Sequence, residues 1–345
     1  MDEGLFTELV TTPGISGREE RIRDVVVARM SELVDDVHVD KLGSVIGKRK
    51  GDAPKVMLSA HMDSIGFLVK HVDDEGFVWP SPVGGFDART LTVQRVLVAG
   101  RRDYVGLMYW KTKPIHVLTS EEKKKSLSLE DLYIDLMIPA DEVKENVSVA
   151  DPITLYRTPL VNDYAVSAPY LDDRLGVYVL LKALERAKKT QSEIHAVVSV
   201  QEEVGLRGAR TSAYGAEPDI GVALDITLAT DTPGVAVGDR VSRLGEGASI
   251  TVMNGASISD PRLVREFERL AKANDITHQK EILPRGGTDA GAIQASRGGV
   301  PVITISTPVR YVHTANEMAA KADVDATVDL MVAFLESAHD IDLSW

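Results

Sequence analysis

The sequence predicts an α/β protein, in which a mostly parallel sheet covered by helices is interrupted in mid-chain by an inserted β-rich domain. Apolar strands alternate with helices near the N-terminus and again over the second half of the chain, which is typical of such a sheet. Between these parts the pattern changes to short β-like pieces. Polar residues follow several of the apolar strands, so we expect a site where the strands end.

The N-terminal part contains one helical pattern and two strand patterns. Apolar side chains recur at helical spacing over residues 18–33, which predicts a surface helix. Residues 37–47 alternate as a strand does, and residues 55–60 form a short apolar run that ends at His61. A polar residue therefore stands at a strand end.

The inserted part, residues 67–160, is expected to form a small β-rich domain. Gly, Asp and Pro separate its β-like pieces, which are FLVKHV, GFVWP, QRVLVAG, YVGLMYW and ITLYR. A helical pattern is found there over residues 139–145. The remaining chain, residues 1–66 and 161–345, is then expected to build one catalytic domain around the sheet.

After residue 161 the alternation of strands and helices returns. In chain order we expect helix 173–189, strand 194–200, a helix near Gly208, strand 220–226, strand 249–253, helix 261–273, strand 301–306 and helix 324–338.

The composition of the 345 residues excludes several kinds of protein. Hydrophobic residues make up 44% and charged residues 26%, as in ordinary soluble globular chains. The net charge of −13 repels polyphosphate backbones and anionic membrane surfaces, so neither nucleic acid nor a membrane is an expected partner. The chain has no cysteine, which excludes disulfides, thiolate zinc sites and cysteine nucleophiles. Its acidic N-terminus is unlike a secretion signal and no apolar run reaches the roughly 20 residues of a membrane span, so we expect a cytoplasmic protein.

Two pairs of candidate site residues lie in the motifs HMD and DDR. In an extended backbone His61 and Asp63 point to the same side, so the Asp63 carboxylate is expected to accept a hydrogen bond from the imidazole and orient it toward a metal. Asp172 and Asp173 precede a helix, where acidic residues ordinarily serve as caps. The functional alternative makes one of these two carboxylates a bridge between two cations.

The other candidates lie in three further segments. Glu202 and Glu203 follow the apolar strand IHAVVSV, and neighbouring side chains there point in different directions, so one can bind metal while the other faces the reacting centre. Asp225 ends a strand and His313 follows another, and each alone would be explained as an ordinary hydrogen-bonded polar residue.

The candidate metal ligands together are two imidazoles and three carboxylates. They are His61, Asp172, Glu203, Asp225 and His313. This mixture suits Zn²⁺, Co²⁺ or Mn²⁺ better than calcium, which prefers oxygen ligands. Two ions about 3.5 to 4 Å apart could share one aspartate and one water.

Over essentially its whole length the chain resembles the M42 family of metallo-aminopeptidases, relatives of the M20 and M28 peptidases that include tetrahedral archaeal aminopeptidases. The motifs of this resemblance are HMD, LDDRLG, QEEVGLRGA, ALDIT, VHT, GGFDAR, KPIHVLT and GGTDAGAI. In this combination and order they are highly specific.

The resemblance implies two divalent metal ions per subunit. The implied ligands are His61, Asp172 and Asp225 for one ion and Asp172, Glu203 and His313 for the other. The bridge would thus be Asp172 rather than Asp173, a choice that spacing alone does not make. Glu202 would be the general base, and Asp63 would support the imidazole.

The resemblance also implies a particular architecture and a substrate class. The sheet would have the phosphorylase/hydrolase-type fold of the M20 and M28 peptidases, and the insertion would be a PDZ-like domain that joins subunits into dimers and tetrahedral dodecamers. Short peptides with a free N-terminus would be the substrates. A water activated by the metals would give its proton to Glu202, which would pass it to the leaving amine.

Two other functions fit parts of the pattern. A glycoside hydrolase also needs two carboxylates, about 5 Å apart in retaining enzymes and about 6.5 to 9.5 Å apart in inverting ones. The adjacent Glu202 and Glu203 would diverge, and the two histidines would have no purpose. A non-catalytic metal-binding assembly protein would keep the ligands but would not need Glu202.

Four further residues lie in segments that can line the pocket for the first substrate side chain. They are Arg243, Arg285, Thr288 and Asp289. Each is explained equally well as a surface-loop or helix-cap residue.

Overall fold

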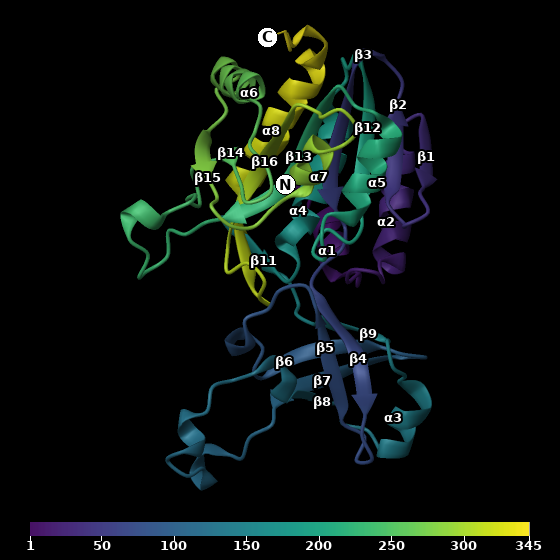
Figure 1. Ribbon diagram of the computed structural model, residues 1–345, viewed down its shortest axis with the longest axis vertical. Helices are drawn as coiled ribbons and strands as arrows, with labels where there is room; N and C mark the ends of the chain where they lie inside the picture. Colours follow the sequence, from purple (N-terminus) through teal and green to yellow (C-terminus); the bar gives the residue numbers. More distant parts are fainter. Residues whose placement is uncertain (345) are drawn as a thin grey trace.

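An eleven-stranded mixed sheet and a closed six-stranded barrel form the two parts of the chain in the computed structural model, which describes residues 1–344 (Figure 1). The sheet occupies the upper part of the view and both termini lie on its side of the molecule, whereas the barrel lies below it. The coarse prediction of an α/β sheet interrupted by a β-rich segment is confirmed.

The strands of the sheet follow the order β1-β2-β12-β3-β13-β16-β17-β11-β10, with β14 also beside β16 and β15 beside β14. Their bounds are β1 Asp36–Val39, β2 Val45–Arg49, β3 Asp52–His61, β10 Leu160–Val161, β11 Ala165–Ala168, β12 Ser192–Ser199, β13 Ile220–Leu228, β14 Ala248–Met253, β15 His278–Ile282, β16 Val302–Arg310 and β17 Glu317–Ala320. Strands β12, β3, β13 and β16 are parallel neighbours at the centre. Pairs toward both margins are antiparallel, so the sheet is mixed and not mostly parallel, because short connections such as β1–β2 allow only antiparallel pairing.

Helices cover both faces of the sheet. Their bounds are α1 Glu3–Thr11, α2 Glu20–Ser31, α4 Leu171–Arg186, α5 Arg207–Ala216, α6 Pro261–Ala273, α7 Asp289–Gln294 and α8 Lys321–Ser337. Buried side chains of α1, α2, α4, α6 and α8 share one apolar core with the sheet, and those of α5 and α7 share another on the opposite face. The sheet is therefore the middle of three layers.

Two differences from the sequence-based expectation lie near the N-terminus. Helix α1 has no counterpart among the predicted elements. Residues 37–47, expected as one strand, form the antiparallel hairpin of β1 and β2. The turn arises because Asp40 Oδ1 accepts hydrogen bonds from the amides of Leu42, Gly43 and Ser44, with Gly43 at a φ of +109° that favours glycine.

The barrel closes in the strand order β4-β5-β8-β7-β6-β9. Its elements are β4 Gly66–Val72, β5 Val78–Val83, β6 Gln94–Ala99, β7 Asp103–Trp110, β8 Leu132–Asp135, α3 Ala140–Asn146 and β9 Pro152–Leu155. Its interior is a separate apolar core. The strands that enter and leave it, β4 and β9, pair with each other, with Phe67 opposite Ile153.

Among the described residues, no helix has the length and apolar character needed to cross a membrane.

Candidate metal centre

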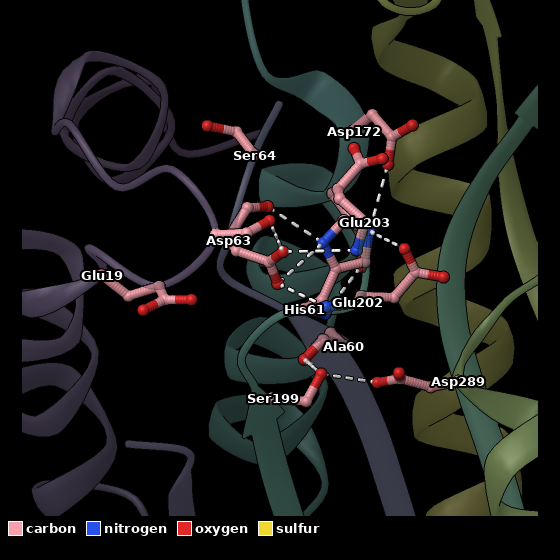
Figure 2. Close-up of polar contacts among 12 residues, drawn as sticks. Glu19, Ala60, His61, Asp63, Ser64, Asp172, Ser199, Glu202, Glu203 and Asp289 are labelled. Atoms are coloured by element: carbon pink, nitrogen blue, oxygen red, sulfur yellow. Dashed lines mark hydrogen bonds and ion pairs between the residues drawn. The ribbon is translucent and has the colours of Figure 1, made fainter. Parts of the chain in front are cut away.

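The site lies where the parallel strands of the sheet end (Figure 2). His61 is the last residue of β3, Glu202 and Glu203 follow β12, and Asp225 lies in β13, three residues before its end at Leu228. Because parallel neighbours end at the same edge, side chains far apart in sequence meet there. They line a cavity of about 640 Å³.

Asp172 lies between the two imidazoles. Its Oδ1 is 3.1 Å from His61 Nε2 and its Oδ2 is 3.3 Å from His313 Nε2. His313 Nε2 is also 3.5 Å from Glu203 Oε1, and that oxygen has no hydrogen-bond partner although it is buried. A buried carboxylate oxygen without a donor fits a metal ligand better than a structural residue.

Two groups of ligand atoms lie close enough together to hold one ion each, with all atoms of a group within 4.8 Å of one another. One group is His61, Asp172 and Glu203, and the other is His61, Asp173 and Asp225. The second contains Asp173 where the family resemblance implies Asp172. Asp173 already accepts hydrogen bonds from the amides of His61, at 3.1 Å, and Gly176, at 2.9 Å, so its oxygens are less available than those of Asp172.

The orientation of His61 differs in one respect from the expectation. Its Nδ1 lies 2.9 Å from the Asp63 backbone carbonyl oxygen and 3.6 Å from the carboxylate oxygen Oδ1. Because a carbonyl oxygen can only accept, Nδ1 donates the proton and Nε2 faces Asp172. The tautomer needed for metal binding is therefore set by the backbone of Asp63, and the expected bond from its carboxylate is not the close contact.

Glu202 lies beside the candidate ligands rather than among them. Its Oε2 is 3.9 Å from His61 Nε2. Burial raises the pKa of Glu202 well above its usual value, and neighbouring Asp225 and Asp289 add to the effect while His61 opposes it. Such a carboxyl group is suited to accepting and returning a proton.

The remaining pKa shifts show how the cluster balances its charge. Burial also raises the pKa of Asp225 well above its usual value, and Asp173 adds to this. Burial alone would lower the pKa of His313, but the carboxylates of Asp172 and Glu203 beside its Nε2 raise it to about 11. Protons on the imidazoles thus balance the carboxylates. Divalent cations supply the same positive charge, so metal binding must release protons here.

Glu317 belongs to the site although it was not among the residues predicted from the sequence. This buried carboxylate accepts a hydrogen bond from the His313 amide at 2.6 Å and from the Asp172 amide at 3.0 Å. His313 has a left-handed backbone with a φ of +61°, which the bond to Glu317 holds in place. The only signal in the sequence is an acidic residue four positions after His313.

The four residues suggested for the substrate pocket lie in different places. Arg285 and Thr288 line the cavity, and apolar side chains such as Leu228 and Leu283 line it with them. Arg243 is exposed outside the lining. Asp289 is buried below the site, where its Oδ2 accepts hydrogen bonds from Ser59 and Ser199, each at 2.6 Å.

The buried imidazole of His61 and the carboxylates grouped with it to hold ions, at the carboxyl ends of parallel strands, define a metal-dependent hydrolase of the α/β class. The family model described as M42 glutamyl aminopeptidase matches residues 43–330. The chain therefore belongs to the M42 peptidase family, and it is an aminopeptidase.

Two curated relatives align over nearly the whole chain. A putative aminopeptidase of Acetivibrio thermocellus is 38% identical and covers 95% of both chains. The lysyl aminopeptidase of Pyrococcus furiosus is 34% identical and covers 100% of this chain and 99% of its own.

Solved structures agree with this assignment. The aminopeptidase APDkam598 from the archaeon Desulfurococcus kamchatkensis has a TM-score of 0.91 at 37% identity, over 96% of this chain and 94% of its own. The Pyrococcus horikoshii TET1 peptidase, which can assemble into a tetrahedron or a large octahedral shell, has a TM-score of 0.86 at 28% identity, over 96% and 98%. A Thermotoga maritima protein named an endoglucanase has a TM-score of 0.80 at 28% identity, over 97% of each chain.

Proposed function

We propose that this aminopeptidase removes single residues from peptide N-termini with two divalent ions, which would be held by His61, Asp172, Glu203, Asp225 and His313. The main support is the position of Asp172, whose two oxygens face different imidazoles at 3.1 and 3.3 Å. A carboxylate placed in this way can bridge two ions. The second support is the buried Glu203 Oε1, which has no hydrogen-bond partner.

Held by these five residues, divalent ions would supply Lewis acidity that lowers the pKa of water and polarises the peptide carbonyl. Glu202 takes the proton of the attacking water and returns it to the leaving amine. His61 keeps Nε2 toward the ions because its Nδ1 donates to the Asp63 carbonyl. The two imidazoles and three carboxylates suit Zn²⁺ or Co²⁺, with Mn²⁺ as a further candidate.

We infer that the sheet is of the M20/M28 peptidase type and that the barrel is a PDZ-like domain that joins subunits. The support for assembly is the similarity to the TET1 peptidase and three outward-facing side chains on β7, namely Val105, Leu107 and Tyr109. We propose a homo-oligomer in which dimers build a tetrahedral dodecamer. A cytoplasmic location and short peptide substrates with a free N-terminus complete this proposal.

A glycoside hydrolase is not favoured, although one structural relative is named an endoglucanase. Glu203 Oε1 lies 3.5 Å from His313 Nε2, and the carboxylates are grouped with imidazoles rather than set apart across a groove. Paired sugar-cleaving carboxylates need no histidine partners. The non-catalytic alternative leaves the buried Glu202 without a role.

The proposal is tested with chelator-treated enzyme assayed on a panel of aminoacyl anilides and on cellulose, with Zn²⁺, Co²⁺ and Mn²⁺ added back in turn. We expect anilide hydrolysis that is lost on chelation and restored by metal, and no hydrolysis of cellulose. Full activity after complete metal removal would contradict the metal-dependent mechanism. Asp172→Asn should lower the metal content at both positions, measured by elemental analysis, and two tightly bound ions in this variant would contradict the bridge.

A further inference from the structure

The segment between helices α1 and α2, residues 12–19, contacts Asp63 and has no part in the mechanism above. Ser16 lies in this segment and is buried. Its hydroxyl donates a hydrogen bond of 2.6 Å to Asp63 Oδ2, which is the shortest polar contact of that carboxylate. Residues more than 40 positions apart in sequence are thus joined directly beneath the candidate metal centre.

The Asp63 carboxylate faces the turn that holds Glu202 and Glu203. Its Oδ1 accepts the amide of Glu202 at 3.0 Å, and its Oδ2 accepts the amide of Glu203 at 3.3 Å as well as the Ser16 hydroxyl (Figure 2). Since the His61 imidazole is held by the Asp63 carbonyl, the Asp63 carboxylate can accept hydrogen bonds from the amides of this turn. The side chain of Asp63 therefore fixes the backbone from which Glu202 projects.

The turn formed by residues 201–203 requires such stabilising hydrogen bonds. Gln201 has a φ of +55°, a left-handed conformation that costs free energy for a residue with a side chain. A carboxylate fully removed from solvent also requires donors for its oxygens. Ser16 supplies the one side-chain hydroxyl that Asp63 receives among the described residues.

The Ser16 hydroxyl is not required to hold its own segment in place. The backbone does so, because the Ser16 amide donates to the Ser64 carbonyl at 3.1 Å and the Ser64 amide donates to the Gly14 carbonyl at 3.0 Å. The buried guanidinium of Arg174 adds bonds to the Leu9 and Thr12 carbonyls. Removal of the hydroxyl should thus leave the segment intact and act on Asp63 alone.

We propose that Ser16 is a positioning residue for the general base: through Asp63 it fixes the Gln201–Glu203 turn and so places the Glu202 carboxylate. This inference rests on the proposed role of Glu202. It assigns a function in the reaction to a segment that lies more than 40 positions from every candidate ligand in the sequence.

Ser16→Ala is the direct test, and Ser64→Ala is its matched control. Ser64 is equally buried and its hydroxyl bonds to Gly14 in the same segment, at 3.2 Å, without touching Asp63. For Ser16→Ala we expect kcat to fall about tenfold, as for loss of one hydrogen bond to a charged group, with KM and metal content unchanged. Ser64→Ala should keep kcat within about twofold of the wild type. Ser16→Thr keeps a hydroxyl and should restore most of the lost rate.

A double-mutant cycle shows whether Ser16 acts through Asp63. In an Asp63→Asn background, Ser16→Ala should cause little further loss of kcat, because the acceptor is already altered. Losses that multiply independently would overturn the proposal. So would equal rates for Ser16→Ala and Ser64→Ala, or a Ser16→Thr variant as slow as Ser16→Ala.

Hydrogen exchange gives a readout that does not depend on activity. Amide exchange in the peptide that contains Glu202 and Glu203 should be several-fold faster in Ser16→Ala than in Ser64→Ala, with or without added metal. Unchanged exchange there would overturn the positioning role. If exchange quickens but Glu202→Gln retains normal turnover, the Ser16 contact stands and the proposed role of Glu202 fails, so the two ideas fail separately.

Discussion

The edge of the sheet and the interior of the barrel bury very different side chains. At the sheet edge Asp63, Asp173 and Asp225 are almost completely removed from solvent beside His61. The barrel interior contains apolar side chains almost throughout, among them Phe67 and Ile134. Among the described residues, only the sheet edge of these two regions therefore buries carboxyl and imidazole groups, and burial disfavours the charged form of such groups.

This difference separates the parts of the chain that serve chemistry from the part that serves stability. Burial raises the pKa of Glu202, Asp225 and Asp173, which means that each destabilises the fold when it is ionised. The barrel core has no such cost and stabilises the fold by removing apolar surface from water. Substitutions in the two regions should therefore affect different measurable quantities.

The largest effect is expected for Glu202→Gln. Turnover should fall by about 10² to 10⁴, the usual contribution of a general base, because the amide cannot accept the proton. Metal content should stay close to that of the wild type, and the thermal midpoint should not fall, since the substitution removes a carboxyl group whose ionised form destabilises the fold. Steady-state kinetics on an aminoacyl anilide and elemental analysis test this, and near-normal turnover would remove Glu202 from the mechanism.

A substitution in the barrel core should instead lower stability and leave turnover unchanged. Ile134→Ala is expected to lower the free energy of unfolding by about 2 to 5 kcal/mol, because Ile134 is fully buried and the substitution leaves a cavity. At 25 °C the folded variant should keep its kcat and metal content. Denaturant unfolding measures the loss, with Val149→Ala, exposed in the same part of the chain, as the control. A loss of activity without a loss of stability would contradict the separation.

A smaller change in stability, this time a gain, is expected for a substitution at Glu19, which lies close to Asp63 in Figure 2. Burial raises the pKa of Glu19 to about 7, and the charge of Asp63 adds to this. The unfolded chain has the lower, ordinary value, so the native state binds more protons between the two, and stability falls as pH rises through this window. Glu19→Gln should therefore raise the free energy of unfolding by about 1 to 3 kcal/mol at pH 8 and by much less at pH 5.

Thermal unfolding at the two pH values measures this gain. Glu20→Gln, at the exposed next residue in the chain, is the control and should show little change at either pH. An equal gain for Glu19→Gln at pH 5 and pH 8 would mean that packing, and not ionisation, is responsible.

Much of the sheet could be predicted from the sequence because its central strands are long apolar runs. His61 and Asp225 were recognised as candidates because each falls at the end of such a run. Strands β10, β11, β15 and β17 were missed, since they are short and have no clear alternation. The β1–β2 hairpin was read as one strand because alternation continues across the turn at Asp40.

Glu317 and Ser16 could not be selected from the sequence for a different reason. Each acts on atoms that only folding brings near: Glu317 on the amides of Asp172 and His313, and Ser16 on Asp63. Hydrogen bonds to backbone amides leave no pattern in residue spacing. The same limit applies to Asp63, where spacing predicted the imidazole as the carboxylate's partner, whereas the structure places the Ser16 hydroxyl closest, followed by two backbone amides.

The pairing of β4 with β9 means that the chain leaves the sheet and returns to it at adjacent points. In topological terms the whole barrel is one long hairpin loop inserted between Asp63 and Asp172. The entropy of closing a loop grows only slowly with its length, so this excursion can lengthen, shorten or be exchanged at little thermodynamic cost to the residues on either side. The outer surface of the barrel can thereby change while the residues of the candidate metal centre keep their positions.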